Sequence, residues 1–298
     1  MTITTFFSYK GGAGRSTTCL NTIPFVAERE DAFSRAPLIL IDMDIESAGM
    51  TYLLNQEDVF KGKNDVKIFL KNEEAWSSEN NCELSEHPFY RWLVPVGKKL
   101  GLDDDYAVMF LGVDDSSPQL NRSDVEGRLD EVMHKLRRFA QNYHCKGIIM
   151  DSAAGDQFSA RLAVDHADTI VFCMKMTHQF RIGTFNYLNK LGIRLGSSAD
   201  EKKVILLPTV VPQDAVIDGV SQMQTSIEDI ANRVNNLSRI EVCDAFVSSA
   251  DMFGINEVMR FKWKEGILFK LRNETEITAD EETALKRYRK LAKIVCDD

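Results

Sequence analysis

Residues suited to phosphate and metal chemistry fall in three short stretches of this chain. The first, Ser8 to Thr17, reads Ser-Tyr-Lys-Gly-Gly-Ala-Gly-Arg-Ser-Thr and follows an apolar run. Glycine lets a backbone turn tightly enough to point successive N–H groups inward, and the start of a following helix adds its positive dipole end. This stretch therefore predicts a nest that binds a polyphosphate.

The other two stretches end apolar runs in carboxylates. Asp42 and Asp44 close the run 37–43, and Asp151 closes the run 147–150. Continuous apolar runs are typical of parallel strands covered on both faces, and ligands collect at the carboxyl ends of such strands. We therefore expect the three acids to lie beside the glycine-rich stretch. Each acid alone equally suits the cap of a strand or helix, and the order of the three motifs favours the nucleotide interpretation.

Strands and helices that alternate along the chain must position these residues. Apolar periodicity predicts most of them, and it favours an α/β fold: a doubly wound, mostly parallel sheet with helices on both faces. Residues 1–298 are expected to form one domain, with a variable insertion at about 55–125 and a basic amphipathic helix at about 279–296. The expected strands are 3–7, 37–44, 91–97, 106–113, 147–155, 168–173 and 204–207, and the expected helices are 16–29, 123–142, 158–164, 177–195, 227–237, one from about 254, and 279–295.

Composition narrows the class of protein. The chain has 298 residues and a formal net charge of -9, which argues against a surface broadly attractive to nucleic acid. No run approaches the roughly 20 apolar residues of a membrane span, and the first residues lack the basic region of a signal peptide. These features predict a cytoplasmic protein. The six scattered cysteines predict neither a disulfide nor a metal cluster: Cys19, Cys82, Cys145, Cys173, Cys243 and Cys296.

The glycine stretch departs from the ordinary P-loop, G-x-x-x-x-G-K-[ST], because Tyr9 stands at the first glycine and Arg15 at the lysine. It resembles the deviant loop K-G-G-x-G-K-[ST] of the ParA/MinD ATPases, and most of all the branch that reads K-G-G-V-G-R-[ST]. The segments that begin at Asp42 and Asp151 resemble that family's D-x-D-x-x-x-P-G and D-x-x-x-G segments, with Ala48 where proline is common. The resemblance implies a P-loop NTPase of the SIMIBI type.

The resemblance also implies ATP and Mg²⁺ as ligands, and it implies a role for each residue. Ser16, Asp42 and Asp151 would hold or support the metal, and Asp44 would orient the attacking water. Lys10 and Arg15 would stabilise the transferred phosphate, with Lys10 reaching across a nucleotide-sandwich homodimer. The nucleotide-binding residues would be Lys10, Gly11, Gly12, Ala13, Gly14, Arg15, Ser16 and Thr17.

The expected function is a slow, Mg²⁺-dependent ATPase whose ATP-bound dimer recruits or licenses a partner protein. The alternative is a partitioning ATPase that cycles on DNA or an anionic membrane, which the negative net charge does not favour. Base preference stays open between ATP and GTP, because Pro208-Thr209 replaces the asparagine with which many relatives read adenine. A tyrosine kinase of the same superfamily is disfavoured, since Tyr288 alone lies near the C-terminus. The terminal helix is expected to dock on the domain or on a partner.

Overall fold

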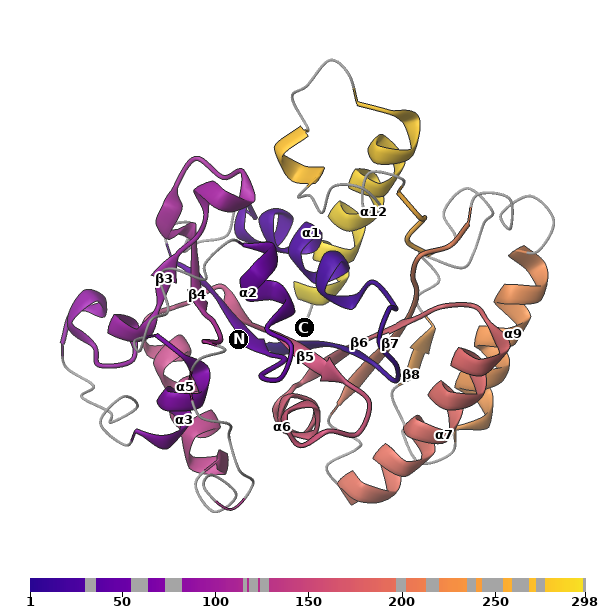
Figure 1. Ribbon diagram of the computed structural model, residues 1–298, viewed down its shortest axis with the longest axis horizontal. Helices are drawn as coiled ribbons and strands as arrows, with labels where there is room; N and C mark the ends of the chain where they lie inside the picture. The colour runs from indigo at the N-terminus through magenta and orange to yellow at the C-terminus, as the bar shows by residue number, and fades with distance from the viewer. Residues whose placement is uncertain are drawn as a thin grey trace.

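The computed structural model places one mixed sheet at the centre of the chain (Figure 1). Within the described residues this sheet has eight strands in the order β3-β4-β2-β5-β1-β6-β7-β8. The structure describes residues 1–29, 36–54, 64–72, 82–114, 117, 123, 129–196, 202–212, 220–234, 240–242, 254–258, 268–271 and 277–296.

Parallel pairing dominates the sheet, as the continuous apolar runs predict. Every neighbouring pair of strands is parallel except β3 with β4. Strand β1 lies between β5 and β6, so the strand order reverses beside it and its carboxyl end is a place where ligands collect. The strands are β1 Ile3–Ser8, β2 Leu38–Met43, β3 Val94–Pro95, β4 Val108–Leu111, β5 Gly147–Ala154, β6 Thr169–Met174, β7 Lys203–Pro208 and β8 Ile240–Val242.

Helices cover both faces of the sheet, which confirms the doubly wound arrangement. Figure 1 shows α1, α2 and α12 on one face and α5, α6, α7 and α9 on the other. None of the described helices combines the length and apolarity that crossing a bilayer requires. The helices are α1 Arg15–Ala27, α2 Gly49–Leu53, α3 Val66–Lys71, α5 Leu129–Asn142, α6 Phe158–His166, α7 His178–Leu195, α9 Val220–Arg233 and α12 Ala279–Cys296.

Two hydrophobic cores result from the pleat of the strands. Along β2, Ile39 and Ile41 face the core beneath α5, α6 and α7, whereas Leu38 and Leu40 face the core beneath α1 and α12. Because successive side chains point to opposite faces, a strand buried on both sides needs an apolar residue at nearly every position. This is why the strands that carry the acids lack polar alternation.

The expected helix from about residue 254 is wrong where the structure describes that region. Gly254 has a φ of 59°, and Ile255 donates its N–H to the carbonyl of Pro208 at 2.8 Å. Asn256 forms an isolated parallel bridge with Val211. The segment therefore extends along the end of β7, because backbone partners from β7 outcompete the local helical bonds.

Two expectations near the sheet edges also need correction. The strand predicted over 91–97 begins as a 3-10 turn, Tyr90–Trp92, and only Val94–Pro95 pairs with β4. Pro95 suits this place, because an edge strand tolerates a residue without an N–H group. At the other edge lies β8, which no sequence signal predicted, since its three residues are too short for a visible period.

Candidate functional site

The glycine-rich loop joins β1 to α1 and turns tightly at two glycines. Gly12 and Gly14 have φ values of 77° and 71°, in the left-handed region that glycine enters without strain. Gly14 directly precedes α1, and its carbonyl accepts the N–H of Thr18 at 2.8 Å. The first turn of a helix leaves its N–H groups without helical partners, so this turn can donate to an anion.

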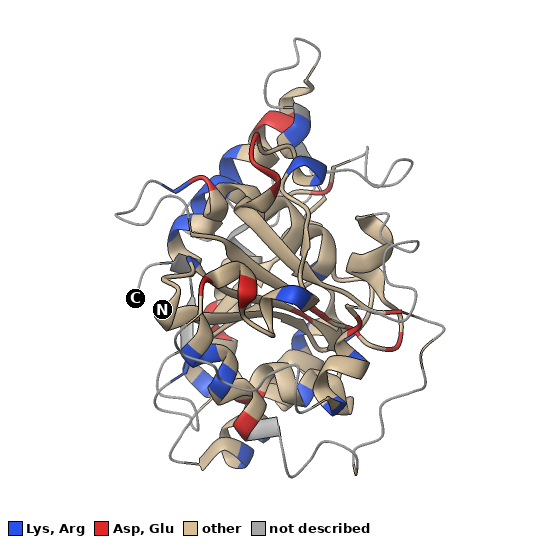
Figure 2. Ribbon diagram, turned by 90° about the vertical axis from the view of Figure 1, so that its left-hand side faces the viewer, with Lys and Arg blue, Asp and Glu red and all other residues tan. Residues whose placement is uncertain are grey.

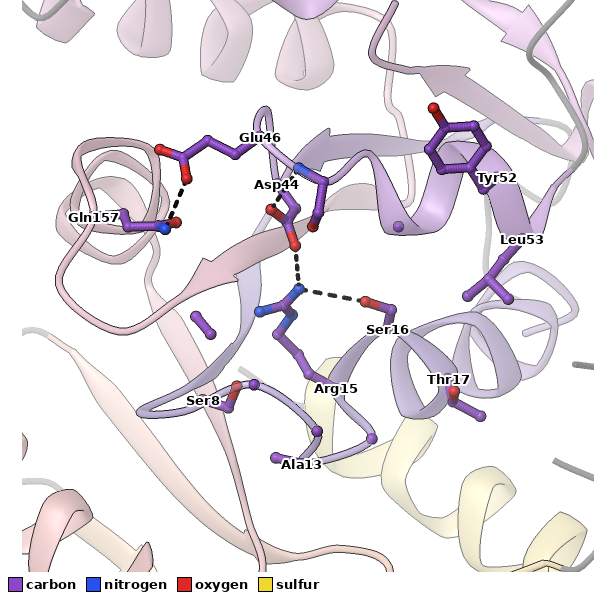
Figure 3. Close-up of a pocket in the computed structure, with 16 residues that line it drawn as sticks. Ser8, Ala13, Arg15, Ser16, Thr17, Asp44, Glu46, Tyr52, Leu53 and Gln157 are labelled. Carbon is purple, nitrogen blue, oxygen red and sulfur yellow. Dashed lines mark hydrogen bonds and ion pairs between the residues drawn. The ribbon is translucent and has the colours of Figure 1, made fainter. Parts of the chain in front are cut away.

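A pocket of about 570 Å³ lies between this loop and the ends of β2 and β5 (Figure 3). All residues from Gly11 to Thr17 line it, together with Asp44 from the end of β2 and Ala154 from the end of β5. The volume is within the range of small-molecule sites. The structure thus brings the predicted loop and the predicted strand ends to one cavity.

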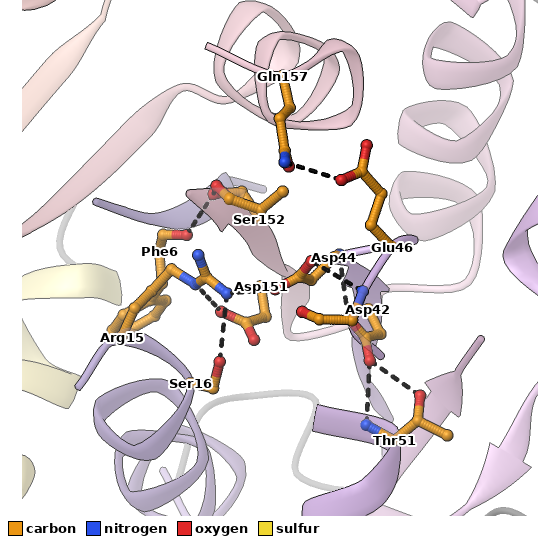
Figure 4. Close-up of polar contacts among 12 residues, drawn as sticks. Phe6, Arg15, Ser16, Asp42, Asp44, Glu46, Thr51, Asp151, Ser152 and Gln157 are labelled. Carbon is orange, nitrogen blue, oxygen red and sulfur yellow. Dashed lines mark hydrogen bonds and ion pairs between the residues drawn. The ribbon is translucent and has the colours of Figure 1, made fainter. Parts of the chain in front are cut away.

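Arg15 joins the two acidic strand ends (Figures 3 and 4). Its Nη2 lies 2.8 Å from Oδ2 of Asp44, and its Nε lies 2.8 Å from Oδ1 of Asp151. All three side chains are buried. Burial alone would lower the pKa of Arg15, but the charges and hydrogen bonds of Asp151 and Asp44 outweigh it and raise that pKa. The guanidinium therefore stays charged and neutralises both acids.

Asp42 and Asp151 face each other on neighbouring strands, because β2 and β5 pair in the register Asp42 to Asp151. Asp42 is fully buried and accepts the N–H of Asp44 at 3.0 Å. It also accepts both the N–H and the hydroxyl of Thr51, at 3.0 and 2.8 Å. Burial and the nearby charge of Asp151 raise the pKa of Asp42 to about 8. Asp42 thus ties the end of β2 to α2, and it does not line the pocket.

Asp151 lies beside Arg15 and Ser16. Arg15 occupies its Oδ1 at 2.8 Å and also donates to Oγ of Ser16 at 3.4 Å (Figure 4). Oδ2 is buried and has no hydrogen-bond partner among the described residues. Burial raises the pKa of Asp151, and the positive charge of Arg15 opposes that rise. A buried carboxylate oxygen beside a serine hydroxyl is a ready ligand for a hard cation.

Lys10 lies apart from the other cation of the loop. Its side chain is exposed and donates to Oε1 of Gln179, in the first turn of α7, at 3.0 Å. It does not line the pocket of its own chain. Its neighbour Tyr9 packs on the same helix, because a Cβ added to Gly183 would come within 2.1 Å of the Tyr9 ring. Gly183 thus makes room for the residue that replaces the first P-loop glycine.

Thr209 and Val210 brace the loop from the end of β7, a role that no sequence pattern predicted. The buried hydroxyl of Thr209 donates to the carbonyl of Ala13 at 2.6 Å. Val210 has a φ of 53°, which is strained for a β-branched residue, and its Cγ2 lies 2.9 Å from the point where a Cβ of Gly14 would be. The loop is therefore held from a strand that lies far away in the sequence.

A polar contact spans the opposite rim of the pocket. Gln157, next to α6, donates to Oε2 of Glu46, in the turn after β2, at 2.8 Å (Figure 3). Both side chains are exposed, so this hydrogen bond is open to water. Glu46 and Gln157 carry no motif of their own, and only their positions just after the acidic strand ends could have indicated them.

No family model and no curated protein matches this sequence. Solved structures do match it over nearly the whole chain. A variant of McdA from Cyanothece, solved as an ATP complex, has a TM-score of 0.62 at 13% identity, and the match covers 99% of this chain and 96% of that one. A ParA family ATPase from Chlorobium tepidum TLS has a TM-score of 0.57 at 14% identity, and the match covers 98% of each chain.

A third similar structure is MinD from Pyrococcus horikoshii OT3, solved with Mg-ADP. Its TM-score is 0.57 at 16% identity, and the match covers 99% of this chain and 95% of that one. Each of the three matches covers at least 98% of this chain. The chain therefore has the fold of the ParA/MinD ATPases.

Proposed function

We propose that this protein is a slow, Mg²⁺-dependent ATPase whose ATP-bound homodimer recruits or licenses a partner protein. One observation carries the proposal: the glycine loop and the acidic strand ends meet at a single pocket of about 570 Å³. Phosphoryl transfer needs little more than phosphate donors, a metal and a positioned water. The similar McdA and MinD structures contain ATP and Mg-ADP, which supports the same ligands here.

The residues present fit a magnesium ion. Mg²⁺ prefers oxygen ligands and is held by one or two side chains together with water and phosphate oxygens. The Ser16 hydroxyl lines the pocket, and the unpartnered Oδ2 of Asp151 is buried nearby, so the two supply oxygen ligands of this kind. When bound, the ion would neutralise charge that develops on the phosphates. The role of Asp42 as a metal ligand stays a prediction, because donors from Thr51 and Asp44 already engage both of its oxygens.

Asp44 and Arg15 account for the expected slow turnover. Asp44 lines the pocket, where its carboxylate can orient water, but Arg15 already holds that carboxylate. The two ion pairs use Nε and Nη2 of Arg15, so Nη1 is the nitrogen that neither pair uses. A guanidinium held by two buried acids is less free to follow the charge that develops in the transition state, which supports slow turnover.

Lys10 supports dimerisation as the response to ATP. It is exposed and lies outside the pocket of its own chain, which supports a role on a neighbouring subunit rather than in cis. The cost of the move is small, because its contact with Gln179 is a single exposed hydrogen bond. Dimerisation would then complete each site with a positive charge from the partner.

A protein partner is favoured over a membrane by the packing of α12. Its apolar stripe, Leu285, Tyr288, Ala292 and Val295, is buried in the core that it shares with α1. The helix therefore keeps that stripe out of reach of a bilayer. Some of its cations are engaged as well: Lys286 pairs with Glu282 at 2.7 Å, and Arg289 lies over the ring of Phe25. Both signs of charge are spread over the side of the molecule in Figure 2.

Light scattering tests the proposal directly. The solution mass would be measured with Mg²⁺ and either ATP, ADP or no nucleotide, on the wild type, on Lys10→Ala and on Lys98→Ala. Lys98 is an exposed lysine beside β3, away from the pocket, and serves as the matched control. We expect the wild type and Lys98→Ala to form a dimer with ATP but not with ADP or without nucleotide. Lys10→Ala should stay a monomer in all three conditions.

The other outcomes are equally informative. A monomer under all conditions, or a dimer that forms without ATP, would contradict the role of Lys10. ATP-dependent binding to DNA that weakens steeply with salt, or ATP-dependent binding to anionic liposomes, would favour the positioning ATPase instead.

A further inference from the structure

Two consecutive residues at the start of the glycine loop turn away from the pocket and contact one helix. Lys10 donates to Oε1 of Gln179 at 3.0 Å. The ring of the preceding residue, Tyr9, lies against Gly183. Gln179 and Gly183 are four residues apart on α7, so they lie on the same face of that helix. Gly11 already lines the pocket, so the chain passes from α7 to the pocket between residues 10 and 11.

The contact between Tyr9 and α7 requires a glycine at position 183. A Cβ added there would lie 2.1 Å from Cε1 and 2.3 Å from Cδ1 of Tyr9, far inside van der Waals contact. Gly183 is buried within a helix and its φ is not positive, so backbone freedom is not the reason for a glycine. Glycine weakens a helix interior relative to alanine. The space that it leaves for the Tyr9 ring therefore explains its presence here.

Tyr9 is also held from the turn that follows β5. The carbonyl of Ser8 accepts the N–H of Gly155 at 2.9 Å. The carbonyl of Tyr9 lies 3.4 Å from the point where a Cβ of Gly155 would be. A tyrosine has only two side-chain torsions to fix, whereas lysine has a flexible four-carbon stem. Tyr9 is therefore a more rigid anchor for this part of the loop than the single exposed hydrogen bond of Lys10.

We propose that Tyr9 is a positioning residue for Lys10. Its ring, seated on Gly183, holds Lys10 on α7 and so keeps the ammonium out of the pocket of its own chain. Consecutive Cα atoms are about 3.8 Å apart, so fixing Tyr9 fixes the point from which the Lys10 side chain starts. This inference rests on the proposed function, because it assumes a nucleotide in the pocket and a role of Lys10 on a partner subunit.

The anchor gives a reason for the departure of this loop from the ordinary P-loop. The ordinary loop has glycine at the position of Tyr9, and glycine has no side chain to seat on α7. Without the anchor, a lysine one residue away from the pocket lining can turn toward phosphates bound in its own chain. With the anchor, Lys10 stays available to a second subunit.

Titration calorimetry with Mg-ADP tests the assignment on the full chain. The affinity would be measured for the wild type, Lys10→Ala, Tyr9→Ala and the double variant Tyr9→Ala/Lys10→Ala. ADP is the ligand because the expected dimer requires ATP, so the titration reports on the pocket of each single chain. We expect Lys10→Ala to change the affinity by less than about twofold while Tyr9 is present. In the Tyr9→Ala background it should weaken binding by about fivefold, the upper range for an exposed charge pair.

Three further proteins separate the ring from other causes. Gly183→Ala displaces the ring by adding a Cβ, so it should make binding depend on Lys10 as Tyr9→Ala does. Tyr9→Phe keeps the ring and should behave as the wild type. The control is Tyr106→Ala, which removes an exposed tyrosine directly before β4. In that background the effect of Lys10→Ala should be as small as in the wild type.

Each result decides a separate point. If Lys10→Ala has the same effect on ADP affinity with and without the Tyr9 ring, Tyr9 does not position Lys10 and the inference is overturned. The Tyr9 and Gly183 variants displace the ring independently, so one series decides the point if the other fails to fold. A wild type that does not bind Mg-ADP would contradict the proposed function itself.

Discussion

The two sides of the glycine loop are stabilised by different interactions, ion pairs on one side and packing on the other. On one side, Arg15, Asp44 and Asp151 are buried charges that neutralise one another at 2.8 Å. On the other side, Val210, Ile255 and Val258 line a smaller cavity together with polar side chains, Glu257 among them. Ion pairs therefore stabilise the first side, and side-chain packing stabilises the second. Substitutions on the charged side should cost both stability and turnover, whereas those on the apolar side should act mainly on stability.

The largest expected effect comes from removing the charge of Arg15. Arg15→Met leaves two buried carboxylates without their cation, and breaking a buried pair in this way costs about 3–5 kcal/mol. Urea unfolding without nucleotide would measure the loss. Arg15→Lys keeps the charge but gives up the fork that reaches both acids, so it should lie between the wild type and Arg15→Met. If Arg15→Met were as stable as the wild type, the ion pairs of Arg15 would not stabilise the charged side, and the contrast between the two sides would be wrong.

Asp44→Asn should separate turnover from binding on the charged side. If Asp44 orients the attacking water, single-turnover phosphate release should slow by about 100-fold or more, while ATP affinity changes little. Asp103→Asn, in an exposed turn, is the matched control. If phosphate release were unchanged in Asp44→Asn, Asp44 would not orient the attacking water, and its role would be limited to the ion pair with Arg15.

Thr209→Val tests how strongly the end of β7 holds the loop. The isosteric change removes the hydroxyl and leaves the Ala13 carbonyl without its donor, at a cost of about 1–3 kcal/mol. Thermal unfolding would show the loss, and Thr209→Ser, which keeps the hydroxyl, should recover most of it. Equal melting temperatures for the wild type and Thr209→Val would mean that the brace is not needed.

The last comparison concerns Gly14, where the two sides meet. Gly14→Ala introduces left-handed strain of about 1–2 kcal/mol and a clash with Val210 Cγ2. Gly12→Ala adds comparable strain with nothing within 4 Å of the new Cβ, so it isolates the strain alone. In the double variant Gly14→Ala/Val210→Ala, the free energy of unfolding should return to near that of Gly12→Ala. A double variant no more stable than Gly14→Ala would exclude Val210 as the source of the clash.

The sequence was sufficient to predict most strands and helices, and to predict which segments meet at the first pocket. The strands that end at Asp42 and Asp151 are continuous apolar runs, and the glycine loop is a contiguous motif, so each is visible in a window of about ten residues. Their meeting follows from one rule, that parallel strands present their carboxyl ends at the same edge. Short elements could not be predicted in this way, because β8 and the segment 254–258 have too few residues to show a hydrophobic period.

Tertiary structure alone decided what the side chains do. Nothing local indicates that Arg15 turns toward Asp44 and Asp151, because that direction depends on the register of β2 with β5 and on the burial of both acids. Likewise Thr209 and Tyr9 contact segments that are distant in sequence, at Ala13 and Gly183. The sequence by itself determined most backbone segments and which strand ends meet the glycine loop at the first pocket, since these depend on local periodicity and chain direction. Long-range packing determined which charges are neutralised, since this depends on which groups are buried together.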